Sequence, residues 1–218
     1  MNELNLLQKI IVWAPPVLFA ITVHEVAHGW VARRLGDPTA MMLGRLTLNP
    51  FKHVDPVGTI VMPGLLLLMQ VPFLFGWAKP VPVTFQNLRN PKQDMAWVAI
   101  AGPAVNLLMA IGWAIFLKLI LAMPEAFSWI AGEHTQLFVY MSIAGISINV
   151  ALMVLNLLPV PPLDGGRILV ALLPGPWSWQ ASRIEPFGLF IVIGLLVSGI
   201  LQSILSVAQT AFFSVLGL

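Results

Sequence analysis

Cysteine is absent from the 218 residues of this chain, and that absence narrows its chemistry. Without thiols the chain forms no disulfide framework and offers no thiolate ligand to a metal. A metal ion in this protein therefore has to be held by histidine, aspartate or glutamate. The sequence supplies 4 histidines and 9 acidic residues in all.

Charged residues are also scarce. Only 9% of the residues are charged, against about 25% in a typical soluble domain, whereas 58% are hydrophobic and the mean hydropathy is +0.89. This composition predicts an α-helical polytopic membrane protein that has the lipid bilayer as a partner. The net charge of +2 rests on few residues, so no nucleic-acid partner is expected. The length suits a single membrane-embedded domain over residues 1–218.

Long apolar runs predict where the chain crosses the bilayer. Four segments are long enough to span it: 10–32, 95–123, 137–158 and 187–216. The first three belong to a core over residues 10–170, and the fourth is an additional C-terminal membrane helix. That fourth segment contains Gly194 and Gly199, so it is either one tilted helix or a broken one.

A fifth apolar run, 59–75, is interrupted by prolines and is harder to assign. The loop 124–136 has acids but no Lys or Arg, whereas the other loops are basic, which places 124–136 outside and the basic loops inside. This orientation holds only if 59–75 makes no net crossing. We therefore expect a membrane-embedded β-hairpin and re-entrant element within 40–94, with short strands near 45–48 and 78–85, and about 4–6 membrane segments in total. An ordinary transmembrane helix is the alternative.

The most informative motif is His24-Glu25-x-x-His28, which lies inside the first apolar run. An unpaired ionisable group costs several kcal/mol in a bilayer, so these three need an internal partner. Residues four apart share one face of a helix, and two imidazoles at that spacing can bind one Zn²⁺. Glu25 then lies beside the metal, placed to take a proton from water there. The alternative is a chance match with buried, hydrogen-bonded histidines.

Two histidines leave a catalytic zinc short of one protein ligand. Most acids of the chain lie in the outer loop or beside basic residues and helix starts, which leaves Asp55 and Asp164. Asp164 follows a proline cluster at the inner end of an apolar run, and Gly165 and Gly166 come directly after it. Prolines stop the helix, glycines permit close backbone approach, and acids on unwound backbone often build ion sites in membranes. Asp164 is the predicted third ligand, with Asp55 next in order.

These motifs resemble the site-2 protease family of intramembrane zinc metalloproteases. The resemblance covers roughly residues 15–170 and rests on His24-Glu25-x-x-His28, Gly102-Pro103-Ala-Val-Asn106, Asn156-x-x-Pro159 and Leu163-Asp164-Gly165, in that order. The segments 44–50, 53–56 and 76–82 are similar to the family's membrane-embedded strand region. The available length leaves no room for the PDZ or CBS-type domain of other branches, so the chain resembles a minimal member.

The resemblance implies one Zn²⁺ per chain bound by His24, His28 and Asp164, with Glu25 as general base. It also implies that Asn106 and Asn156 contact the substrate backbone or stabilise the oxyanion. Helix packing is the alternative role for Asn106, and a helix C-terminal cap is the alternative for Asn156. The implied partner is a transmembrane protein or peptide substrate, cleaved near the cytoplasmic face of a prokaryotic cell (inner) membrane.

His53 and Asp55 remain as a possible secondary polar site, since an H-x-D pair can bind metal, admit water or hydrogen-bond the hairpin. A structural hydrogen bond is the favoured interpretation. Two other classes of function compete with the protease. One is a non-catalytic metal-binding or metal-transporting membrane protein, which should show internal repeats that this chain lacks. The other is an inactive scaffold, which the complete set of motif residues argues against. The sequence leaves the oligomeric state and the substrate's identity open.

Overall fold

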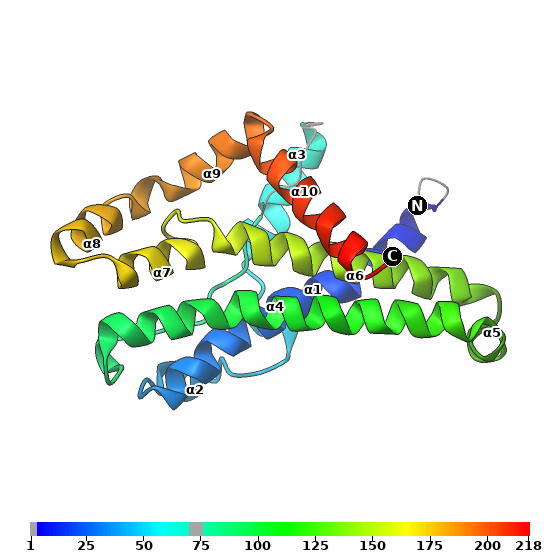
Figure 1. The fold of residues 1–218 in the computed structure, drawn as a ribbon, viewed down its shortest axis with the longest axis horizontal. Coiled ribbons are helices and arrows are strands. Elements are labelled where there is room, and N and C mark those ends of the chain that lie inside the picture. The colour runs from blue at the N-terminus through cyan, green and yellow to red at the C-terminus, as the bar shows by residue number, and fades with distance from the viewer. Residues whose placement is uncertain (1–3, 70–75) are drawn as a thin grey trace.

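The computed structural model describes residues 4–69 and 76–218, and within them the chain is all helical (Figure 1). Three long helices dominate: α1 (Leu6–Arg34), α4 (Pro91–Ala122) and α6 (Thr135–Leu157). The shorter α-helices are α2 (Thr39–Met42), α3 (Met62–Leu68), α5 (Pro124–Ala131), α7 (Asp164–Leu172), α8 (Gly175–Ser182), α9 (Gly188–Val197) and α10 (Ile200–Val215). Single turns of 3-10 or π helix lie at Pro50–Lys52, Pro56–Val61, Phe85–Asn87, Gly132–His134 and Glu185–Phe187.

The three long helices pack against one another, with α4 and α6 running alongside each other (Figure 1). Small residues allow the close approach: Ala110 and Ala114 of α4 are buried, and a Cβ on Gly145 of α6 would lie 2.4 Å from the Trp113 ring. Small residues at helix interfaces are how membrane helices associate without a hydrophobic driving force. The bundle is the scaffold that brings distant polar residues together.

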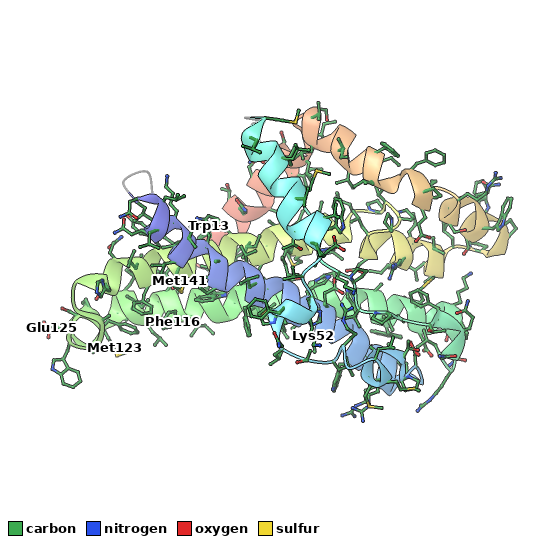
Figure 2. The ribbon with its side chains drawn as sticks, turned by 180° about the vertical axis from the view of Figure 1, so that it is seen from behind. Trp13, Lys52, Phe116, Met123, Glu125 and Met141 are labelled. Carbon is green, nitrogen blue, oxygen red and sulfur yellow. The ribbon has the colours of Figure 1, made fainter. Side chains whose placement is uncertain are left out.

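Within the described residues, four helical runs are long and apolar enough to cross a membrane: Leu6–Arg34, Pro91–Ala122, Thr135–Leu157 and Gly175–Val197. The first three confirm the spans predicted at 10–32, 95–123 and 137–158. Large apolar side chains such as Ile115 stay exposed on their outward faces, as lipid-facing surfaces require. Figure 2 shows Trp13, Phe116 and Met141 in the half of the bundle that ends at Glu125.

The fourth span lies earlier in the sequence than predicted. The sequence predicts an additional membrane helix over 187–216 that is either tilted or broken, and the chain does break at Gly199, where φ is +76°. Glycine adopts this left-handed conformation without steric cost, so α9 ends and α10 starts in a new direction (Figure 1). With 10 and 16 residues, α9 and α10 extend only about 15 and 24 Å, and neither crosses a hydrocarbon core of about 30 Å alone.

The predicted strands near 45–48 and 78–85 are wrong, because the described residues contain no strand. Pro80 and Pro82 have no N–H to donate to a ladder. The N–H of Lys79 instead donates to the His53 carbonyl (2.9 Å), and the N–H of Val81 is used by a side chain of α1. We call residues 76–83 the strap.

Part of the predicted re-entrant run, 70–75, lies outside the described residues. The described part is helical from Pro56 to Leu68, and its two turns of six and seven residues reach about 20 Å, less than a bilayer core. Asp55 caps this run, accepting hydrogen bonds from the N–H groups of Val57 (3.0 Å) and Gly58 (2.7 Å).

Asp37 fixes the end of the strap to the end of α1. Its carboxylate is fully buried and accepts hydrogen bonds from the N–H of Thr84 (2.7 Å), the amide of Asn87 (3.1 Å) and both N–H and hydroxyl of Thr39. Burial raises the pKa of Asp37, but these hydrogen bonds outweigh burial and hold the pKa below its usual value. Asp37 therefore acts as a charged anchor for the chain that follows the strap.

Candidate metal centre

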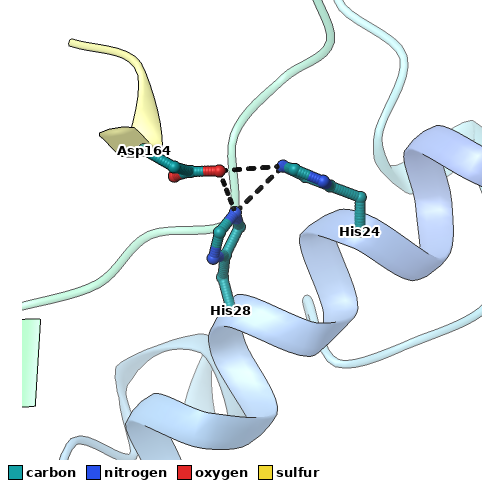
Figure 3. A group of neighbouring side chains, drawn as sticks. All are labelled: His24, His28 and Asp164. Atoms are coloured by element: carbon teal, nitrogen blue, oxygen red, sulfur yellow. Dashed lines mark hydrogen bonds and ion pairs between the residues drawn. The ribbon is translucent and has the colours of Figure 1, made fainter. Parts of the chain in front are cut away.

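His24, His28 and Asp164 meet in the interior, each offering one ligand atom to a common point (Figure 3). The His24 Nε2 and His28 Nε2 atoms are 3.0 Å apart, and Asp164 Oδ2 lies 3.3 Å and 3.2 Å from them. Tetrahedral zinc with bonds of about 2.0–2.1 Å separates its ligand atoms by about 3.3 Å. The triangle therefore has the size of one face of a zinc coordination sphere.

Hydrogen bonds on the far side of each ring determine what the Nε2 atoms offer. His24 Nδ1 lies 2.6 Å from the Asn106 side-chain oxygen, and His28 Nδ1 lies 2.7 Å from the Val98 carbonyl oxygen. Both partners are acceptors, so both Nδ1 atoms carry the proton and donate. Each neutral ring then directs the Nε2 lone pair at the other ring and at Asp164.

Those lone pairs make the site a good fit for a cation. Two bare nitrogens and the oxygen of a carboxylate face one another at 3.0–3.3 Å, and Asp164 Oδ2 is buried without a hydrogen-bond donor. Side by side in an apolar interior these groups repel one another, whereas a divalent ion between them satisfies all three. The donor set of two imidazoles and one carboxylate is one that catalytic zinc uses.

Asp164 reaches the two histidines because the chain turns sharply after α6. The prolines from Pro159 to Pro162 prevent α6 from continuing, and α7 begins at Asp164. A Cβ on Gly165 would lie 2.3 Å from the Leu157 carbonyl oxygen, and one on Gly166 would lie 2.1 Å from the Pro161 nitrogen. The two glycines thus let α7 fold back against the end of α6, as the sequence predicted.

Gly102 of α4 forms the floor under the imidazoles. A Cβ at this position would lie 2.4 Å from His24 Cε1 and 2.5 Å from His28 Nε2. Any larger residue would overlap the two imidazole rings. Gly102 is buried, and the absence of a side chain there leaves room for the two imidazole rings.

Glu25 is not part of the group formed by His24, His28 and Asp164, and its place beside the metal stays a prediction. Its Oε2 accepts a hydrogen bond from the Val81 N–H of the strap at 2.7 Å. Arg45 in turn donates to the carbonyls of Lys79 (3.0 Å) and Pro80 (3.3 Å). The strap therefore touches the acid through its backbone and is itself anchored by an arginine.

Asn106 and Asn149 extend the site into the bundle. Asn106 is fully buried and donates through Nδ2 to the Asn149 side-chain oxygen at 2.9 Å, while its own oxygen serves His24. The sequence offered helix packing as an alternative role for Asn106, but it did not predict the contact with a ligand. Asn149 was missed, although an Asn two helical turns before Asn156 in an apolar run lies on the same face.

The remaining predicted residues make hydrogen bonds to groups other than His24, His28 and Asp164. Asn156 lies inside α6 and donates through Nδ2 to the Leu152 carbonyl four residues earlier (3.0 Å), whereas the C-cap of α6 is Leu158, so Asn156 is not the helix cap weighed as its alternative role. His53 contacts the Thr47 carbonyl through Nε2 (2.9 Å). Asp55 caps the helical run that follows it. Within the described residues neither belongs to a metal-ligand group, so both have the structural hydrogen bonds that the sequence favoured.

Comparison with known proteins supports this chemistry. Peptidase family M50 matches residues 119–198, which include Asp164. "Putative zinc metalloprotease YwhC" of Bacillus subtilis is 40% identical over 183 residues, 84% of this chain and 78% of that protein. Proteins named "Putative zinc metalloprotease Rip2" from Mycolicibacterium smegmatis and Mycobacterium tuberculosis are 30% and 29% identical; each match covers 83% of this chain and 64% and 63% of theirs. No solved structure matches the chain.

The similarity to YwhC extends over most of both proteins, and the family match falls on the part of the chain that carries Asp164. The fold agrees with it, because the metal-ligand group lies among helices able to cross a membrane. The chain therefore belongs to peptidase family M50, the site-2 protease family, and is a zinc metalloprotease of the membrane.

Proposed function

We propose that this protein is an intramembrane endopeptidase that hydrolyses a peptide bond within or next to a transmembrane segment of another membrane protein. The observation that carries the proposal is the convergence of two imidazole nitrogens and a buried carboxylate oxygen among apolar helices. A hydrolytic site surrounded by lipid-facing helices is open to substrates that are themselves in the bilayer. The partner is therefore a transmembrane protein or peptide.

The chemistry is assigned to residues of the site. His24, His28 and Asp164 would hold one Zn²⁺ per chain, which would supply the Lewis acidity that lowers the pKa of a water and polarises a peptide carbonyl. Glu25 accepts the proton of that water and, once protonated, delivers it to the leaving amine. The hydrogen bond from Val81 N–H holds one oxygen of Glu25 in place for this transfer.

The substrate has to present an unwound backbone, because helical carbonyls are already hydrogen-bonded and screened by side chains. Asn156, half-buried at the C-terminal end of α6, is the asparagine we propose for contact with that backbone. Asn106 is fully buried, so we assign it no contact with the substrate; it acts through its hydrogen bond with His24. A bond from Asn156 to the substrate would replace the one to Leu152.

We place the site in the cytoplasmic half of a bacterial cell membrane. Arg33 and Arg34 end α1, whereas Glu125 lies at the α5 end of the bundle (Figure 2). Basic residues favour the cytoplasmic side. Ten residues of α1 separate His24 from Arg34, which is about 15 Å along the helix, a short path for water from the inner face.

Glu25→Gln tests the mechanism. The purified variant in liposomes is expected to bind zinc as wild type does and to cleave a reporter transmembrane substrate at least about 100-fold more slowly, because the amide cannot accept the proton. Glu125→Gln, an exposed acid at the far end of the bundle, is the matched control and should cleave normally. Normal cleavage by Glu25→Gln would show that the general base has been misassigned.

Zinc content tests the ligand set and separates the protease from a metal transporter. Wild type should retain about one zinc per chain after dialysis, and Asp164→Ala should lose it and its proteolytic activity together. A variant that keeps its zinc would move the third ligand elsewhere. Wild-type protein that binds zinc, cleaves no transmembrane reporter and moves zinc across the liposome membrane would favour the transport alternative.

A further inference from the structure

Asn149 is a polar residue buried at the middle of α6, in a helix able to cross a membrane. Its side chain is fully inaccessible, and both of its polar atoms are used: Oδ1 accepts from Asn106 at 2.9 Å and Nδ2 donates to the Gly145 carbonyl at 2.8 Å. Burying an amide among apolar groups is costly unless each atom is paired. The pairing here continues to His24, whose Nδ1 contacts Asn106.

A backbone carbonyl fixes the orientation of both amides in this chain of hydrogen bonds. The Gly145 carbonyl can only accept, so Asn149 must present its NH₂ to Gly145 and its oxygen to Asn106. Asn106 must then present its NH₂ to Asn149 and its oxygen to His24. His24 consequently carries its proton on Nδ1, which leaves the Nε2 lone pair facing Asp164 and His28.

The Nδ1 partner of His28 differs from the Nδ1 partner of His24, and this difference indicates a role for Asn149. The Nδ1 proton of His28 is fixed by the Val98 carbonyl, a group that cannot reverse its polarity. The partner of His24 is an amide, which can turn by 180° and offer a donor where it offered an acceptor. In that orientation His24 would carry its proton on Nε2 and could not bind a metal through that atom. A second residue is needed to hold the amide.

We propose that Asn149 is a positioning residue of the metal centre: it holds the Asn106 amide so that His24 keeps the tautomer that binds zinc. The inference rests on the proposed function, since it assumes that His24 is a zinc ligand. Outer-sphere partners of metal-binding histidines typically change metal affinity by about 10–100-fold when removed.

The test compares the zinc dissociation constants of three variants by chelator competition in detergent. Asn149→Leu removes both polar atoms and should weaken zinc binding by about 10–100-fold. Asn149→Asp should stay within a few-fold of wild type, because a carboxylic acid kept neutral by burial both donates to Gly145 and accepts from Asn106. Ser142→Ala is the matched control: Ser142 is equally buried on α6, and among the described residues its hydroxyl bonds only to the Phe138 carbonyl of the same helix (2.7 Å), so zinc affinity should not change.

Two further measurements separate positioning from packing. In an Asn106→Leu background, adding Asn149→Leu should cost no further zinc affinity, because both residues act through one path. The visible spectrum of the Co²⁺-loaded protein should change with Asn149→Leu and not with Ser142→Ala. Thermal unfolding of the metal-free variants checks that each is folded, and Asn149→Ala replaces Asn149→Leu where leucine does not fit.

The outcomes distinguish this inference from the proposed function. If a folded Asn149→Leu binds zinc as tightly as wild type, or if the losses in the double variant add, the positioning role is overturned while the zinc site stands. Wild-type protein that binds no zinc overturns the proposed function, and this inference with it.

Discussion

The residues proposed to bind the metal and the residue proposed as general base are held by contacts of two different kinds. Around His24 the contacts are made by side chains that project from long helices, and Asn106 and Asn149 are fully buried. Around Glu25 the contact comes from backbone, since Val81 reaches the acid through its N–H and the flanking Lys79 and Pro80 are exposed. The proposed metal ligands are held by interior packing, whereas the proposed general base depends on a strap in which the two residues before Val81 are exposed. The two should therefore fail independently.

Gly102→Ala should have the largest effect, and it should disturb the packed metal centre without disturbing the strap. The new Cβ would lie 2.4–2.5 Å from the His24 and His28 rings, so the rings must leave their positions. Zinc affinity should fall by more than the ~100-fold that removing an outer-sphere partner costs. Gly112→Ala on the same helix, where a Cβ meets nothing within 4 Å, is the control and should bind zinc normally. Equal zinc affinities for the two variants would contradict the proposed floor of the site.

Val81→Pro should disturb the contact between the strap and Glu25 without disturbing the metal centre. It removes the N–H that holds Glu25, so the acid loses its orientation, and the cleavage rate should fall by about 10–100-fold while zinc affinity stays at the wild-type value. Val83→Pro adds the same ring two residues later, at an N–H for which the described part of the chain shows no acceptor. Cleavage and zinc binding are the two readouts. A loss of zinc in Val81→Pro would mean that the strap also supports the metal.

Asp37→Asn should give the smallest effect, on stability only. Losing the charged acceptor of Thr84 and Thr39 should lower the free energy of unfolding at pH 7 by about 1–3 kcal/mol, with zinc affinity unchanged. Because the folded pKa of Asp37 lies below its unfolded value of 3.8, its stabilisation is complete above that value and disappears as the pH falls through the folded pKa. Thermal unfolding from pH 7 to pH 3 should show the two proteins converging; a constant difference would argue against the charge.

Sequence patterns were sufficient where the physics is local. Spacing four apart places His24 and His28 on one helical face, and twenty apolar residues are enough to predict a span. Patterns were insufficient where backbone groups compete. Residues 78–85 alternate as a strand would. Two of them are prolines without an N–H, and the N–H of Val81 donates to Glu25, so these groups are not available for pairing with another strand. Likewise the glycines of the apolar run 187–216 indicated a possible helix break, but only the φ of Gly199 decides that the helix does break there.

By itself the sequence determined the kind of chemistry: a chain without cysteine that carries His-Glu-x-x-His and an Asp-Gly-Gly turn in apolar surroundings favours His24, His28 and Asp164 as metal ligands, with Asp55 next in order. Only the tertiary structure decided which atom of each ring is offered. That choice depends on acceptors 70 and 82 residues away in the chain, the Val98 carbonyl and the Asn106 amide. A tautomer is set by what lies on the far side of the ring, and no local spacing carries that information.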